Sequence, residues 1–146
     1  MSTTIGQSKT IERFVARKLD LLGSNEVEAA RIDSIGEHVR DIKQKYNDFN
    51  RGKKDAELET AKDNFIKVEL PKLSALMEKC LDANGYAIGS KLSLADISLF
   101  NLYKDYFDDV AGAIAAIEQC PNIQSAVNNA TSAVADYLST RVFTKF

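Results

Sequence analysis

The sequence has few of the residue types that form self-contained active sites. It contains one histidine, His38, together with two cysteines and no tryptophan. Because no second histidine or cysteine lies at ligand spacing from His38, we predict no zinc or iron site and expect His38 to have a surface or interface role. No serine occupies a Gly-x-Ser-x-Gly turn, and no glycine-rich loop follows a strand pattern. We therefore predict no catalytic residue within these 146 residues.

Charge and hydropathy exclude two further classes of partner. The formal net charge is −2, whereas nucleic-acid binding needs a basic surface that releases counterions. No run approaches the roughly 20 apolar residues that span a bilayer, and the start, Met1-Ser2-Thr3-Thr4, lacks the order of a secretory signal. We expect neither nucleic acid nor a membrane as partner, and a cytoplasmic location. Cys80 and Cys120 are then expected to be buried thiols, with a disulfide between them left open.

Hydrophobic spacing predicts helices almost throughout the chain. The predicted helices cover residues 11–22, 26–49, 58–80, 94–108, 111–118 and 121–138, the last as one or two helices. The second carries a one-sided apolar stripe that predicts antiparallel packing on a neighbouring helix. Gly23 ends the first helix, and Pro71 predicts a bend near Glu69 and Leu70. Since no alternating strand pattern and no repeat is present, we predict an all-α bundle of about six helices.

Residues 89–97 carry the most informative local motif. Ser93 and Asp96 have the spacing of a capping box, in which the serine caps the first helical amides and the acid reaches back to the serine amide. Leu92 and Ile97 are placed to form a hydrophobic staple across the same helix start. The following residues are apolar on nearly every face, so we expect this helix in the middle of the domain.

Two charged faces allow two interpretations. Asp33, Glu37 and Asp41 recur every four residues on one helix, while Arg13 and Arg17 lie four apart on another. Such spacing places each set on a single helix face. The faces are either both solvated or complementary at a packed or subunit interface, where arginine suits bidentate pairing with carboxylates.

In order along the chain, these features resemble the cytosolic glutathione transferases, nearest to their sigma and pi types. Gln7-Ser8 and the helix after it are similar to the last helix of that family's thioredoxin-like domain. The long second helix, the Pro71 helix and the 89–96 capping motif are similar to its C-terminal helical domain, and 121–138 is similar to its closing helices. The resemblance implies two parts, with residues 1–22 as a remnant of the glutathione-binding domain and 23–146 as the helical domain.

The resemblance also implies site residues. Glutathione, the co-substrate of the family, would be contacted by Gln7 and Ser8 at its γ-glutamate and by Asp41 from the neighbouring subunit. Positions that meet across the family's dimer axis match Arg13, Arg17 and Asp33. The wall of the electrophile pocket would include Tyr46, Arg51 and Phe143.

One departure from the family pattern limits the expected activity. Family members place the residue that stabilises the glutathione thiolate ahead of the Gln-Ser pair, and this chain begins six residues before Gln7. Because thiolate formation needs a donor or positive potential at the sulfur, we expect weak or partial glutathione binding and little or no conjugation. We expect an exposed apolar face, covered by a second copy or by a thioredoxin-like domain. The alternative is a non-enzymatic helical module that binds another protein. No cofactor is expected.

Overall fold

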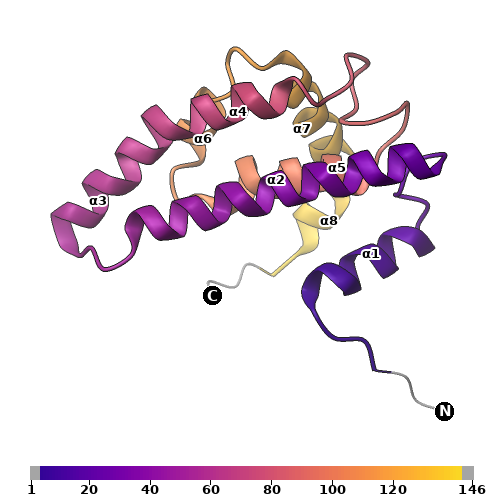
Figure 1. The fold of residues 1–146 in the computed structure, drawn as a ribbon, viewed down its shortest axis with the longest axis horizontal. Helices are drawn as coiled ribbons and strands as arrows, with labels where there is room; N and C mark the ends of the chain where they lie inside the picture. Colours follow the sequence, from indigo (N-terminus) through magenta and orange to yellow (C-terminus); the bar gives the residue numbers. More distant parts are fainter. Residues whose placement is uncertain (1–3, 143–146) are drawn as a thin grey trace.

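The computed structural model describes residues 4–142, which form helices joined by turns and contain no strand (Figure 1). The first part comprises α1 (Ser8–Lys18), α2 (Glu26–Asn50), α3 (Asp55–Asn64), the π-helical segment η1 (Phe65–Glu69) and α4 (Leu70–Glu78). The second part comprises α5 (Leu94–Asn101), the π-helical segment η2 (Leu102–Tyr106), α6 (Val110–Ala115), α7 (Pro121–Ala133) and α8 (Ala135–Thr140). The all-α prediction is confirmed. Each of the six predicted helical segments is present, although π-helical turns divide two of them.

The long helix α2 crosses the whole molecule, with α3 and α4 running back beside it (Figure 1). The Asn25 side chain accepts a hydrogen bond from the Glu28 amide at 2.9 Å, and acids in the first turn complement the helix dipole. The predicted stripe faces the core, with these residues buried: Ile32, Ile35, Val39, Ile42 and Tyr46. Antiparallel packing on a neighbour is confirmed.

The two π-helical segments mark the places where regular helix meets a constraint. In η1 the Leu70 amide bonds to the Phe65 carbonyl, a wider turn that ends just before Pro71. A proline ring crowds the carbonyl four residues earlier, so an enlarged turn at that point relieves the clash. The wider turn begins at Phe65, four residues before Glu69, and the bend expected near Glu69 and Leu70 stays a prediction.

Helix α5 lies at the centre, between α2 and α7. The capping box at its start is present. Asp96 accepts hydrogen bonds from the Ser93 amide at 2.8 Å and from the Ser93 hydroxyl at 2.6 Å, and both residues are fully buried. The other carboxylate oxygen accepts from the Ala87 amide at 2.7 Å, so Asp96 also fixes the loop that leads into the helix.

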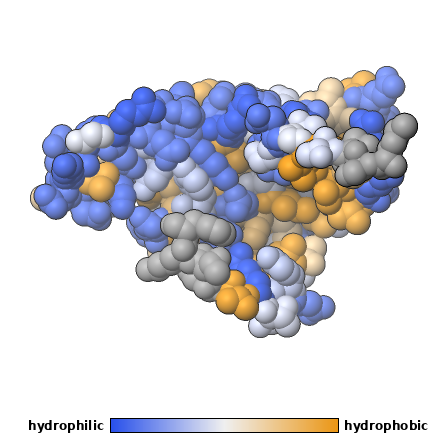
Figure 2. Space-filling view, turned by 90° about the horizontal axis from the view of Figure 1, so that it is seen from below, coloured by the Kyte–Doolittle hydropathy of each residue, from blue (hydrophilic) through white to orange (hydrophobic). Residues whose placement is uncertain are grey.

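Helix α1 stands apart from the bundle, below the start of α2 in Figure 1. Its backbone link to the bundle is a hydrogen bond from the Leu94 amide to the Leu21 carbonyl at 2.9 Å. The apolar side chains of α1 are about half exposed: Ile11 44%, Phe14 48%, Val15 45% and Leu19 63%. Apolar residues gather over this helix in Figure 2. The expected exposed apolar face is confirmed.

The two cysteines differ in environment. Cys120 is buried as expected, and burial raises the pKa of its thiol. Cys80 is exposed, so its prediction as a buried thiol was wrong. The reason is that α4 ends at Glu78, and the side chain at position 80 no longer follows the buried stripe of that helix. Both thiols are free.

Candidate functional site: the start of α1 and the outer faces of α2

Gln7 and Ser8 lie at the exposed start of α1. Gln7 is the residue before the helix and has a φ of 69°, a left-handed conformation that is uncommon for a residue with a side chain. Its carbonyl accepts the first helical hydrogen bond, from the Ile11 amide at 3.0 Å, and no side chain caps the helix. The first amides of an uncapped helix are donors that favour an anion. This end of α1 therefore has free donors next to two exposed polar side chains.

The charged faces of α1 and α2 meet within one chain. Nε of Arg13 donates to Asp33 at 2.8 Å, and its Nη2 donates to Glu37 at 3.2 Å. The hydrogen bond to Asp33 is the main cause that raises the pKa of Arg13. The sequence left open whether the charged faces are solvated or complementary at an interface. For Arg13 they are complementary, because it pairs with carboxylates of α2 in the same chain. Arg17 is exposed, and its place at a dimer axis stays a prediction.

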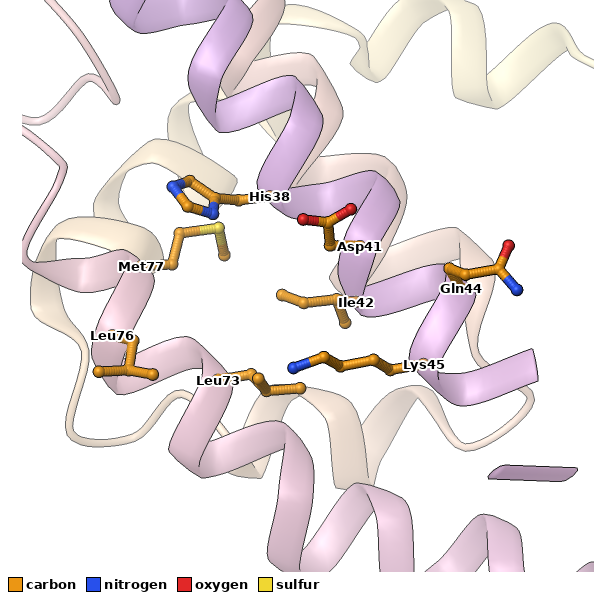
Figure 3. A pocket seen from close by; sticks show the side chains of 8 residues that line it. All are labelled: His38, Asp41, Ile42, Gln44, Lys45, Leu73, Leu76 and Met77. Atoms are coloured by element: carbon orange, nitrogen blue, oxygen red, sulfur yellow. The ribbon is translucent and has the colours of Figure 1, made fainter. Parts of the chain in front are cut away.

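Between α2 and α4 runs an open groove of about 390 Å³. Its floor is apolar and is made by Ile42, Leu73, Leu76 and Met77. Figure 3 shows His38 and Ile42 of α2 facing the α4 side chains, with Asp41 beside them and Gln44 pointing away from α4. Leu76 is 61% exposed, so part of this apolar floor is open to solvent. The expected surface or interface position of His38 is confirmed.

Asp41 lies at the edge of this groove and not beside Gln7 or Ser8. No hydrogen bond or ion pair among residues 4–142 joins these three side chains to one another or to other groups. The three residues assigned to glutathione by resemblance are thus exposed and unpaired, on two separate surfaces. Their role in glutathione binding stays a prediction.

The residues expected in an electrophile pocket are dispersed. Tyr46 is 9% exposed and packs edge-on against the rings of Phe65 and Phe107, with centroids 5.2 and 5.1 Å away. It also lines a hollow of about 230 Å³ between α2, α3 and the start of α6. Arg51 follows the end of α2 and pairs with Asp48 at 2.6 Å. Phe143 lies outside the described residues.

A polar cluster formed by α2, the end of α5 and η2 was not predicted from the sequence. Nζ of Lys43 donates to the Asn101 side-chain oxygen at 2.6 Å and lies 4.6 Å from the centre of the Tyr106 ring. The Tyr106 hydroxyl donates to Asn47 at 3.0 Å. Burial is the main cause that lowers the pKa of Lys43. One signal was available, since Lys43 lies four residues from Val39 and three from Tyr46, on the flank of the buried stripe.

The described part of the chain lacks two kinds of feature. Within it, no group of three histidine, cysteine, aspartate or glutamate side chains is arranged to hold a metal ion. None of its helices combines the length and the apolar character that a bilayer span requires.

Comparisons with known proteins agree with this architecture. A family model described as "Glutathione S-transferase, C-terminal domain" matches residues 40–141. A glutathione S-transferase of Plasmodium yoelii yoelii is 30% identical over 142 residues, which covers 89% of this chain and 65% of that protein. The solved Pi-class glutathione S-transferase of Onchocerca volvulus is 30% identical with a TM-score of 0.77, covering 96% of this chain and 67% of that chain. A glutathione S-transferase of the hookworm Necator americanus, described as monomeric, is 26% identical with a TM-score of 0.80, covering 97% and 71%.

The match extends over most of this chain but not over the whole of its relatives. The chain spans about half to two thirds of the length of the curated relatives it matches. The family model alone covers well over half of this chain. The chain therefore belongs to the glutathione S-transferase family, and its residues 40–141 match the C-terminal domain of that family.

Proposed function

We propose that this chain contributes one part of a glutathione transferase site and one face of a dimer, and conjugates little or no glutathione by itself. In this proposal Gln7 and Ser8 hold the γ-glutamyl end of glutathione, and Asp41 reaches the glutamyl amine bound by a second copy. The observation that carries the proposal is the uncapped start of α1, where free amides adjoin two unpaired polar side chains. A carboxylate at this position satisfies donors that the chain leaves open.

Little activity is expected because no described group is placed to ionise the glutathione thiol. Lowering a thiol pKa to near neutrality needs a donor or a positive charge aimed at the sulfur. Near Gln7 and Ser8, the closest charged side chains on α1 are Lys9 and Glu12, which pair with each other at 2.6 Å. The half-exposed apolar face of α1 also supports an incomplete site, because a further structural unit against it would bring additional groups close to Ser8.

The dimer face is supported by the groove between α2 and α4. A leucine that is 61% exposed at an apolar floor gains free energy when a second copy covers it. The rim carries both acid and base, Asp41 and Lys45, so a copy related by a two-fold axis meets opposite charges. Arg17 remains available for such contacts, whereas Arg13 already has two carboxylates.

Glutathione titration followed by amide NMR tests the partial site. We expect chemical shift changes at residues 7–10 and a dissociation constant weaker than about 1 mM. Replacing both Gln7 and Ser8 by alanine is expected to abolish these changes, while Ser34→Ala on the exposed side of α2 leaves them intact. Micromolar binding, or turnover of a chromogenic electrophile above the uncatalysed rate, contradicts a partial site. Unchanged spectra up to about 10 mM glutathione contradict the assignment of Gln7 and Ser8.

Sedimentation equilibrium tests the dimer face. We expect a dimer that Leu76→Glu converts to a monomer, because the substitution buries a charge in the apolar groove. Tyr137→Glu on α8 is a matched control, since Tyr137 is exposed to a similar extent, 64% against 61% for Leu76. A wild-type chain that stays monomeric at high concentration excludes this face as a stable interface.

A non-enzymatic interaction module remains the second candidate, and the exposed α1 face is the observation that favours it. In that case another protein covers Ile11, Phe14, Val15 and Leu19. The two functions separate by ligand dependence. A partner complex that is unaffected by glutathione and by the Gln7 and Ser8 substitutions, but is lost in Phe14→Glu, supports the module.

A further inference from the structure

Lys43 is a half-buried cation without a counterion among the residues that the structure describes. Its ammonium group is held by one neutral acceptor, the Asn101 side chain at 2.6 Å, and by the face of the Tyr106 ring at 4.6 Å. Within residues 4–142 it forms no ion pair. Charged groups of this kind are stabilised by pairing when they leave water, so an unpaired one is an unusual feature.

The acids around Lys43 are already paired with other cations. Glu12 of α1 accepts from Lys9 at 2.6 Å. Asp105 of η2 accepts from two nitrogens of Arg141, at 2.6 and 3.1 Å. Burial is the first cause that lowers the pKa of Lys43 and the like charge of Lys9 the second, so the acids that raise it do not compensate. The surroundings therefore leave a net positive charge at this point.

The neighbours of Lys43 also provide an apolar wall with a polar edge. The Tyr106 ring is half-buried and packs edge-on against Phe107, with ring centroids 5.2 Å apart. Its hydroxyl is held in place by Asn47, an exposed residue one turn after Lys43 on α2. A planar ligand that packs beside Tyr106 can place an anionic group at the ammonium and replace the missing counterion.

We propose that Lys43, with Tyr106 and Asn47, binds the polar end of the electrophile and selects aromatic electrophiles that carry a carboxylate or sulfonate. This inference rests on the proposed function, because it places the electrophile on the face of α2 that looks toward α1 and η2. Lys43 acts as a specificity-determining residue, and no bond to it is made or broken. The ligand anion forms a charge-assisted hydrogen bond with Nζ, and the aromatic body covers Tyr106.

Two fluorescent probes that differ in charge test the assignment on the chain as it exists. Anilinonaphthalene sulfonate carries the predicted aromatic body and anion, while N-phenylnaphthylamine has almost the same body without the sulfonate. We expect Lys43→Met to weaken binding of the sulfonate about tenfold and to leave the neutral probe within about twofold, since one charge-assisted contact is lost. Lys43→Arg, which retains the charge, is expected to keep most of the affinity.

Lys67→Met is the matched control, because it removes an exposed cation of η1 that pairs with Asp63 at 2.7 Å and has no place in the proposed sites. We expect this variant to bind both probes as the wild type does. Equal weakening of both probes by Lys43→Met overturns the proposal. So does an effect of Lys67→Met as large as that of Lys43→Met, and so does a wild type that does not bind the sulfonate. Since neither probe requires glutathione, these outcomes are independent of the glutathione titration, whose failure alone removes the proposed function.

Discussion

Asp96 is the side chain whose removal the structure predicts to be most damaging. It is fully buried, and its two carboxylate oxygens accept from the amides of Ser93 and Ala87 at 2.8 and 2.7 Å. In Asp96→Ala both amides lose their acceptor in a site closed to water. Each buried donor left without a partner costs roughly 1–3 kcal/mol, which gives about 4 kcal/mol for the two.

One effect reduces this figure. Burial is the main cause that raises the pKa of Asp96, so the wild type carries a desolvation cost that alanine does not have. This cost offsets part of the loss, so the expected fall in the free energy of unfolding lies somewhat below about 4 kcal/mol. Since domains of this size are stable by roughly 5–15 kcal/mol, the variant is expected to remain folded with much reduced stability.

Urea denaturation followed by far-UV circular dichroism measures the effect. Asp109→Ala is the control, because Asp109 also caps a helix, accepting from the Gly112 amide at 2.8 Å, but is exposed. Loss of an exposed cap costs about 1 kcal/mol. Asp96→Asn, which retains one acceptor oxygen, is expected between the two. If Asp96→Ala and Asp109→Ala prove equally stable, burial does not give Asp96 its importance and the reasoning is wrong.

Two further predictions concern the loops that position α1 and α5. Gly23→Ala is expected to lower the free energy of unfolding by about 2–3 kcal/mol, because φ is +78° and an added Cβ would lie 2.6 Å from the Cβ of Glu28. The control Gly52→Ala has a similar φ of +77° but no atom within 4 Å of the added Cβ, so it is expected to cost about 1 kcal/mol. Equal losses in urea denaturation contradict the steric reason. Asp82→Asn is expected to lose about 1 kcal/mol at pH 7, because the hydrogen bond from Arg31 lowers the pKa of Asp82. A carboxyl group with a lowered pKa stabilises the fold at pH values above its unfolded pKa of about 3.9, and this stabilisation is lost as the pH falls through the folded pKa. The difference in the free energy of unfolding between the wild type and Asp82→Asn should therefore shrink between about pH 4 and pH 2. A difference that is the same at about pH 3 and at pH 7 refutes the ion pair as its cause.

The helices and their burial were predictable because their signals are local. The stripe of α2 and the capping box of α5 depend on residues within a few turns of each other, and both are present in the structure. The same locality explains the failure at Cys80. The prediction extended the apolar spacing of residues 58–80 as far as Cys80, but α4 ends at Glu78. The end of a helix is set by its tertiary neighbours as well as by the sequence.

What the sequence did not predict depends on contacts between distant segments. The bond from Ala87 to Asp96 and the position of Lys43 beside Tyr106 each join residues from different elements. Resemblance supplied Gln7, Ser8 and Asp41 and implied that Asp41 acts from a neighbouring subunit, but the particular surface on which each residue lies came only from the structure. The conversion of part of a predicted helix into η1 was signalled only by Pro71, whose effect reaches back over five residues.

The contacts that hold α1 are weak in comparison with the apolar surface that it leaves open. Its ion pairs with α2 through Arg13 are partly exposed, and each such pair contributes at most about 1 kcal/mol. The apolar side chains from Ile11 to Leu19 are about half exposed, so covering them adds roughly 1 kcal/mol each, about 4 kcal/mol in total. A structural unit that packs on this face therefore determines the position of α1 more strongly than the bundle does. Because Gln7 and Ser8 are carried on that helix, the same unit sets the distance between the proposed glutathione contacts and the ammonium of Lys43.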